Sequence, residues 1–100
     1  MEIKKVALIG LGSIGSFLAP RLEQALGHDA FRVVAGGERK EKLHRRGVTI
    51  NGENWHFALA DPQDEPDWAD LVIVTVKYGG LPRAIEDIRN QVGPDTTIVS

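Results

Sequence analysis

The fold of this chain is decided by residues 4–15, which read KKVALIGLGSIG. The first half is a short, nearly continuous apolar run bounded by charge and glycine, a pattern typical of a parallel strand buried on both faces. The second half has the spacing G-x-G-x-x-G, and apolar side chains follow it at the three- and four-residue intervals of an amphipathic helix. A strand, a glycine loop and a helix in this order predict a site for the pyrophosphate of a dinucleotide.

Each glycine of the loop has a separate physical task. Gly10 permits the tight turn, Gly12 leaves no Cβ in the path of a pyrophosphate, and Gly15 lets the helix pack close to the strand. Free amides and the positive end of the helix attract phosphate groups. The alternative is an ordinary tight connection between a strand and a helix. We expect the cofactor-binding loop to consist of Gly10, Leu11, Gly12, Ser13, Ile14 and Gly15.

Outward from this loop, strand and helix patterns alternate along the chain. The first helix is expected to end near Gly27, with Pro20 bending it or removing a hydrogen bond. This order predicts the α/β class, with a Rossmann-type open, mostly parallel sheet and helices on both faces. The remaining predicted elements are strands at 31–35, 71–76 and 96–100, helices at 38–46 and from 81 to about 93, a solvated acidic connection at 61–70, and a hairpin of 48–50 and 55–58 around Asn51-Gly52, with Glu53-Asn54 lengthening its loop.

Composition narrows the class of protein. The 100 residues carry a formal net charge of -2 and no cysteine, which excludes a disulfide framework and a cysteine nucleophile and gives no overall attraction to nucleic acid. No apolar run is long enough for a membrane span, and Met1 to Lys5 leads directly into a strand, so we expect a cytoplasmic protein without a membrane partner. Residues 1–100 fit one dinucleotide-binding domain, and the apolar end at Ser100 suggests a piece of a two-domain protein.

The residues after the second strand decide between NAD and NADP. An acid at the strand tip holds the ribose hydroxyls of NAD, but this tip is Ala35-Gly36-Gly37. Glu38 follows, yet the bases directly after it favour an extra phosphate, so we expect NADP (NADPH) held by Arg39 and Lys40. For the remaining bases of this helix, the favoured interpretation is a solvated face: Lys42, Arg45 and Arg46.

Other chemistry has little support in the sequence. The three histidines, His28, His44 and His56, show no spacing typical of metal ligands, and the acids of 61–70 match no calcium loop. Ser13 and Ser16 have no paired base. We therefore expect no metal site and no nucleophilic serine in this chain.

Three segments together resemble the amino-terminal NADP-binding domain of 2-dehydropantoate 2-reductase, or ketopantoate reductase. They are residues 3–15, Gly37-Glu38-Arg39 with 46–52, and residues 70–77, and the likeness spans essentially the whole chain. The glycine loop is shared by many dehydrogenases, whereas the hairpin after the second helix and the lysine that follows the 71–76 strand are more specific.

The resemblance implies reduction of the ketone of 2-dehydropantoate by NADPH, in pantothenate biosynthesis. Lys77 corresponds to the lysine of the family near the nicotinamide, although a surface lysine at a strand end is the alternative. The resemblance also implies that the catalytic lysine and the substrate-binding glutamate belong to a helical carboxyl-terminal domain that is absent from this chain, so we expect no catalytic residue here and no activity of the chain alone. Expected partners are a 2-keto acid, that helical domain and, in the full-length protein, a second copy. Gly36 departs from the family pattern, which often has an arginine there.

Two other functions fit the same sequence. A non-catalytic module that senses NAD(P) would explain the short length, but such a module is expected to carry the missing acid after the second strand. A related reductase of another 2-keto acid is the third possibility and is not excluded, because fold and cofactor site do not define the substrate.

Overall fold

A computed structural model describes residues 3–100, and it describes Tyr78 by its backbone alone. Met1 and Glu2 lie outside the described residues, so the expectation that Met1 to Lys5 leads directly into a strand is covered only from Ile3 onward. Five strands form one sheet in the order β5-β2-β1-β6-β7, and all four neighbouring pairs are parallel. Since β1 lies between β2 and β6, the order reverses there, which confirms the Rossmann-type prediction. The strands are β1 (Val6–Ile9), β2 (Phe31–Val34), β5 (Ala58–Ala60), β6 (Leu71–Val74) and β7 (Thr97–Val99).

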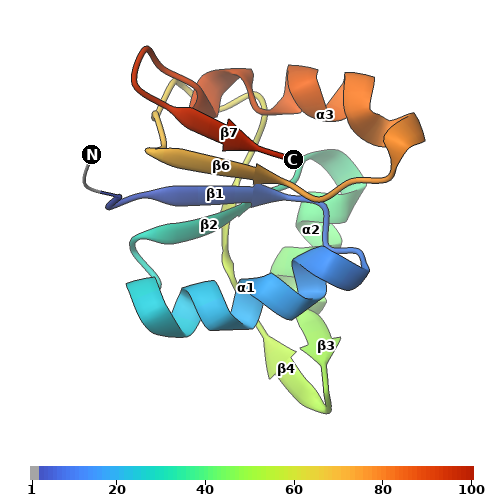
Figure 1. Ribbon diagram of the computed structural model, residues 1–100. Helices are drawn as coiled ribbons and strands as arrows, with labels where there is room; N and C mark the ends of the chain where they lie inside the picture. The colour runs from blue at the N-terminus through green and yellow to red at the C-terminus, as the bar shows by residue number, and fades with distance from the viewer. Residues whose placement is uncertain (1–2) are drawn as a thin grey trace.

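Helices cover both faces of this sheet. Figure 1 views the layers along the sheet, with α3 above the strands and α1 below them. Helix α1 is continuous from Ser13 to Leu26 and keeps Pro20 inside it. The other helices are α2 (Gly37–Arg46) and α3 (Leu81–Asp87), with short 3-10 turns η1 (Tyr78–Gly80) before α3 and η2 (Arg89–Gln91) after it.

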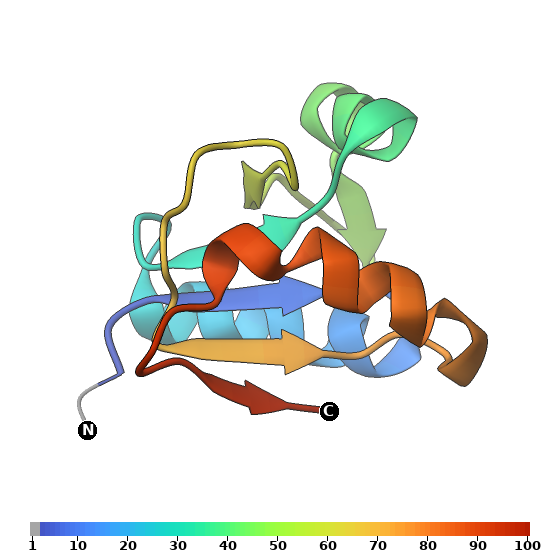
Figure 2. The same ribbon diagram turned by 90° about the horizontal axis from the view of Figure 1, so that it is seen from above.

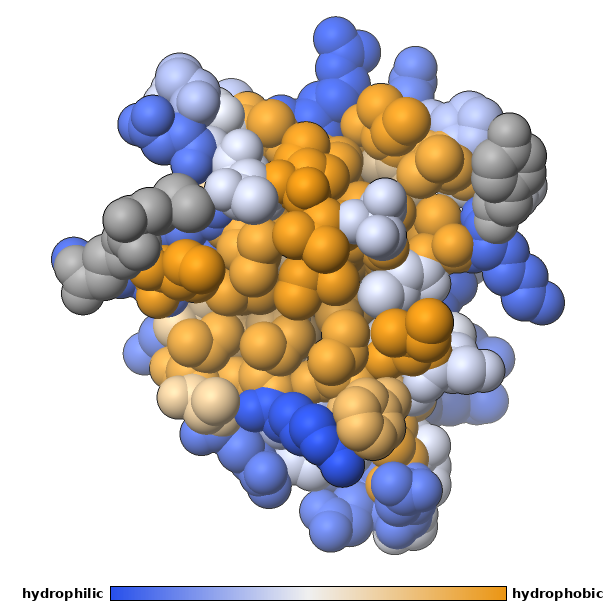
Figure 3. All heavy atoms as spheres, viewed as in Figure 1, coloured by the Kyte–Doolittle hydropathy of each residue, from blue (hydrophilic) through white to orange (hydrophobic). Residues whose placement is uncertain are grey.

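Alternation along β1 divides the core in two. Val6 and Leu8 pack on the α1 side with Phe31, whereas Ala7 and Ile9 pack on the α3 side. All four side chains of β1 are buried, as expected for the central strand of a parallel sheet. Apolar surface remains at the β7 edge, which Figure 3 shows toward the viewer. There Ile98 is 50% and Val99 is 49% exposed.

The hairpin is confirmed, but its loop is shorter than predicted. β3 (Val48–Ile50) pairs antiparallel with β4 (Glu53–Trp55), and Glu53 lies opposite Ile50. The expectation that Glu53-Asn54 lengthens the loop is wrong, because Asn51 and Gly52 both have positive φ, 50° and 81°, and close a two-residue turn. Ala58 does not belong to the hairpin. It begins β5, a strand of the main sheet that the sequence did not predict.

The acidic connection of residues 61–70 is mostly exposed, as predicted, but it is fixed at several points. Figure 2 shows it running back along the sheet toward the start of β6. The Asn90 side-chain amide donates to the Asp61 and Asp64 carbonyl oxygens at 2.9 and 3.0 Å. Arg32 donates from Nη1 to the Asp67 carboxylate at 3.1 Å. These bonds therefore hold the connection in place between the end of β5 and the start of β6. Within the described residues, no helix is long and apolar enough to cross a membrane.

Candidate cofactor-binding site

The first glycine of the loop is held in place by Thr75, the residue that directly follows β6. Gly10 has φ +103°, and a Cβ there would lie 2.7 Å from the Thr75 carbonyl oxygen. Thr75 donates its hydroxyl to the Gly10 carbonyl at 2.6 Å and its amide to the Ile9 carbonyl at 2.9 Å. Only glycine fits this position, because a side chain would meet both a strained backbone and the neighbouring strand. Thr75 thus fixes the turn that begins the loop.

The other two glycines differ in what surrounds them. A Cβ on Gly15 would overlap the Gly10 carbonyl oxygen, so close packing of α1 against β1 requires glycine. A Cβ on Gly12 would meet nothing within 4 Å. Gly12 is also the residue that precedes α1, and no side chain caps the helix there. The space in front of this helix end is therefore open.

The first turn of α1 offers unpaired amides to that space. The amides of Ser13, Ile14 and Gly15 have no acceptor inside the helix. The first helical bond runs from the Ser16 amide to the Gly12 carbonyl at 2.8 Å. Ser16 also donates its hydroxyl to the Leu11 carbonyl at 3.1 Å, which holds the loop. Free amides and the positive helix end together can bind an anion.

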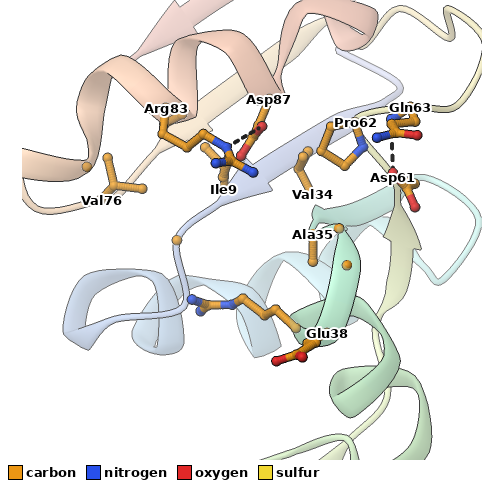
Figure 4. Close-up of a pocket in the computed structure, with 16 residues that line it drawn as sticks. Ile9, Val34, Ala35, Glu38, Asp61, Pro62, Gln63, Val76, Arg83 and Asp87 are labelled. Carbon is orange, nitrogen blue, oxygen red and sulfur yellow. Dashed lines mark hydrogen bonds and ion pairs between the residues drawn. The ribbon is translucent and has the colours of Figure 1, made fainter.

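A cleft of about 690 Å³ lies at the carboxyl ends of β1, β2 and β5 and against α3. Figure 4 shows Arg83 and Asp87 on one side of it and Glu38 with Ala35 on the other. Parallel sheets bind ligands at this edge, where the strand order reverses. Gly10 is the loop residue that lines the cleft. The apolar residues that line the cleft are Ile9, Val34, Ala35, Pro62, Val76 and Ala84.

The two bases expected to hold a phosphate are placed differently. Arg39 is exposed and lines the cleft, as does Glu38. Lys40 lies outside the lining, and its Nζ is 3.2 Å from the Asp61 carboxylate, which does line the cleft. The Gln63 backbone amide and then Lys40 lower the pKa of Asp61 below its ordinary value. Asp61 therefore stays ionised and keeps Lys40 beside the cleft.

Lys77 is not among the residues that line the cleft. It follows Val76, the last cleft residue of the segment after β6, and its side chain is exposed. Its carbonyl accepts the Gly80 amide at 2.8 Å, which forms the turn into η1. The structure thus brings Gly10 and Arg39 to one cleft, while Lys40 and Lys77 flank it.

Sequence reasoning missed four residues in or beside the cleft. Thr75 had a visible signal, since it is the one polar residue in the apolar run 71–76. Arg83 and Asp87 also had one, because bases and acids four residues apart pair on a helix; their Nε and Oδ1 atoms are 3.2 Å apart. Asp61 had no separate signal, because it was grouped with the solvated connection.

The three histidines converge although their sequence spacing gave no sign of it. His28, His44 and His56 line one hollow of about 380 Å³ together with Lys40. Among the described residues, no group of three histidines or acids is arranged to hold a metal ion. His28 bonds Glu23 at 2.9 Å, and that hydrogen bond raises the pKa of His28 above its ordinary value.

The strand order, the glycine loop with its open helix end and the cleft together define a Rossmann-type dinucleotide-binding domain. The family is shown by the sequence itself. The model of the family described as ketopantoate reductase PanE/ApbA matches residues 6–100, and the chain belongs to this family of oxidoreductases.

Solved structures have the same fold. A putative ketopantoate reductase from Ralstonia solanacearum MolK2 is 26% identical with a TM-score of 0.73, over 97% of this chain and 31% of that one. D-mandelate dehydrogenase with NADH and anilino(oxo)acetate is 23% identical with a TM-score of 0.75, over 94% of this chain and 32% of that one. A dimeric ketopantoate reductase from Staphylococcus aureus is 20% identical with a TM-score of 0.64, over 94% and 34%.

The chain spans about a third of the length of the structures that it matches. No curated protein matches it significantly. The likeness to the dehydrogenase and to the Staphylococcus protein shows the fold alone, since each is under 25% identical.

Proposed function

We propose that residues 1–100 are the NADPH-binding domain of a two-domain reductase that converts 2-dehydropantoate to pantoate in pantothenate biosynthesis. The observation that carries this proposal is the open, uncapped end of α1 beside the cleft that Arg39 lines, in a chain of the ketopantoate reductase family. The residues present fit a dinucleotide, because Gly12 leaves free the space that its phosphates need.

Each candidate residue has a distinct task in this proposal. The loop, consisting of Gly10, Leu11, Gly12, Ser13, Ile14 and Gly15, holds the pyrophosphate through its amides. Arg39 binds the 2′-phosphate, with Lys40 supporting it from its ion pair with Asp61. Lys77 faces the nicotinamide. NADPH, when bound, supplies the hydride for the keto group, and residues outside this chain supply the proton and bind the substrate.

Nucleotide titrations of the full-length protein test the cofactor assignment. We expect NADPH to bind at least about tenfold tighter than NADH, because the 2′-phosphate gains charge-assisted bonds. Arg39→Ala should remove most of this preference and Lys40→Ala a smaller part, because Lys40 is already paired. Lys42→Ala on the exposed face of α2 is the matched control. If both variants kept the full preference, the phosphate assignment would be wrong.

A reductase of another 2-keto acid is the second candidate, because fold and cofactor site do not define the substrate, and D-mandelate dehydrogenase with NADH and anilino(oxo)acetate has the same fold. Rates of NADPH and NADH oxidation with 2-dehydropantoate and with an aryl 2-keto acid separate the two in the full-length protein. Faster turnover of the aryl acid would replace the proposed substrate. Residues 1–100 alone should give negligible turnover with either, and light scattering of the full-length protein tests the expected homodimer.

A further inference from the structure

The cleft presents a second arginine from the wall opposite Arg39. Arg83 lies on α3, is 84% exposed and lines the cleft, and its Nε is 3.2 Å from the Asp87 carboxylate one turn later. Figure 4 shows the pair joined on the α3 side, with Glu38 facing it across the cleft. Neither the family match nor the proposed phosphate site assigns a role to this pair.

The position of the cleft indicates which half of a dinucleotide it receives. In this fold the pyrophosphate lies at the loop after β1, and the adenosine ribose lies at the tip of β2. The cleft is lined by the β2 tip, by Asp61 to Gln63 after β5 and by α3, but not by Lys77. It is therefore the adenosine side of the site.

The lining of the cleft suits a flat, uncharged ring. Its floor comes from buried Ile9, Val34 and Ala35, and Ala84 and Val76 continue this apolar surface toward α3. A guanidinium group stacks well on an aromatic face, since it is planar and weakly hydrated. Arg83 is the planar cation on the α3 side of this apolar surface.

We propose that Arg83 covers the purine ring of the bound cofactor and that Asp87 positions its guanidinium for this contact. The inference rests on the proposed function and adds an adenine-binding residue to it. The pair with Asp87 engages Nε at the edge of the guanidinium group and leaves its flat face for stacking on a ring. The α3 wall thus recognises the base, whereas Arg39 on the α2 wall recognises the 2′-phosphate.

Calorimetric titration with fragments of the cofactor separates these two tasks in the full-length protein. The probes are 5′-AMP, adenosine 2′,5′-bisphosphate and nicotinamide mononucleotide. We expect Arg83→Ala to weaken both adenosine probes by the same factor, about five- to tenfold, and to leave the nicotinamide probe unchanged. Arg39→Ala should weaken the bisphosphate alone. Arg89→Ala, at an exposed arginine of η2 outside the cleft, is the matched control.

Asp87 is tested as a positioning residue by a double-mutant cycle. Asp87→Asn alone should weaken 5′-AMP by about two- to fourfold, because Arg83 loses its fixed orientation. In the Arg83→Ala background the same change should have no further effect on 5′-AMP, whereas a merely structural role would weaken binding in both backgrounds. Arg83→Lys, which keeps the charge without the plane, should recover less than half of the lost affinity.

Two outcomes overturn the inference. Unchanged 5′-AMP affinity in Arg83→Ala would show that Arg83 makes no contact with the base, and a loss confined to the bisphosphate would make it a phosphate ligand. The failure of the proposed function looks different, since the unsubstituted protein would then bind neither NADPH nor NADH. If the unsubstituted protein binds NADPH and Arg83→Ala leaves the affinity for 5′-AMP unchanged, only the adenine-binding role of Arg83 is refuted.

Discussion

The two ends of the parallel strands are built in opposite ways. At the amino end, polar groups pair with one another: Arg32 donates to Gln91 at 2.6 Å, Gln91 donates to Asn90 at 3.2 Å, and the Asp70 carboxylate accepts two backbone amides. At the carboxyl end, the first amides of α1 have no acceptor within the helix, and the Arg39 side chain lines an open cleft. Paired groups contribute to stability, and open ones remain available to a ligand.

Substitutions in the glycine loop test this difference between the two strand ends with the largest expected effect. Gly15→Ala should lower the free energy of unfolding by about 3 kcal/mol or more, because its Cβ overlaps the Gly10 carbonyl. Gly12→Ala should lower it by about 1 kcal/mol or less, since its Cβ meets nothing and only the preference for glycine at the helix N-cap is lost, yet weaken NADPH binding by about tenfold or more.

Urea unfolding and nucleotide titration of both variants measure this pair of effects. The comparison requires stability loss at Gly15 and binding loss at Gly12. Equal loss of stability in both variants would show that the open end of α1 is needed for folding and is not reserved for a ligand.

The second effect lies at the amino end of the strands. Gln91 is 2% exposed and joins Arg32 to Asn90. Gln91→Leu should lower the free energy of unfolding by about 2 kcal/mol, because it leaves the Arg32 guanidinium and the Asn90 carbonyl without this partner. NADPH affinity, measured where the variant is fully folded, should stay within about twofold. Weaker binding would show that the two ends are coupled.

The same contrast explains what the sequence could predict. The strands β1 and β6, the loop and α1 were predictable because apolar runs and glycine spacing are local signals. The strand β5 was missed because Ala58–Ala60 is short and joins β2 only through distant pairing. The four-residue spacing of Arg83 and Asp87 could indicate their pair, but not that α3 places this pair at the cleft. The cleft itself and the convergence of the three histidines depend on how separate elements pack, which no spacing along the chain records.

The smallest effect concerns the carboxylate that fixes the start of the described chain. Asp70 accepts the Lys4 and Lys5 amides at 2.8 and 2.9 Å, and these bonds hold the pKa of Asp70 below its ordinary value of 3.8. A lowered folded-state pKa stabilises the protein above pH 3.8, and this contribution is lost as the pH falls through the folded-state pKa.

Asp70→Asn keeps an oxygen acceptor for the two amides but removes the charge. We therefore expect a shallower loss of thermal stability below pH 3.8 than in the unsubstituted protein, with a small difference at pH 7. Unfolding midpoints measured from pH 7 to pH 2.5 test this, with Asp95→Asn at an exposed aspartate before β7 as the control. An unchanged acid slope in Asp70→Asn would mean that the ionised carboxylate does not stabilise the amino end.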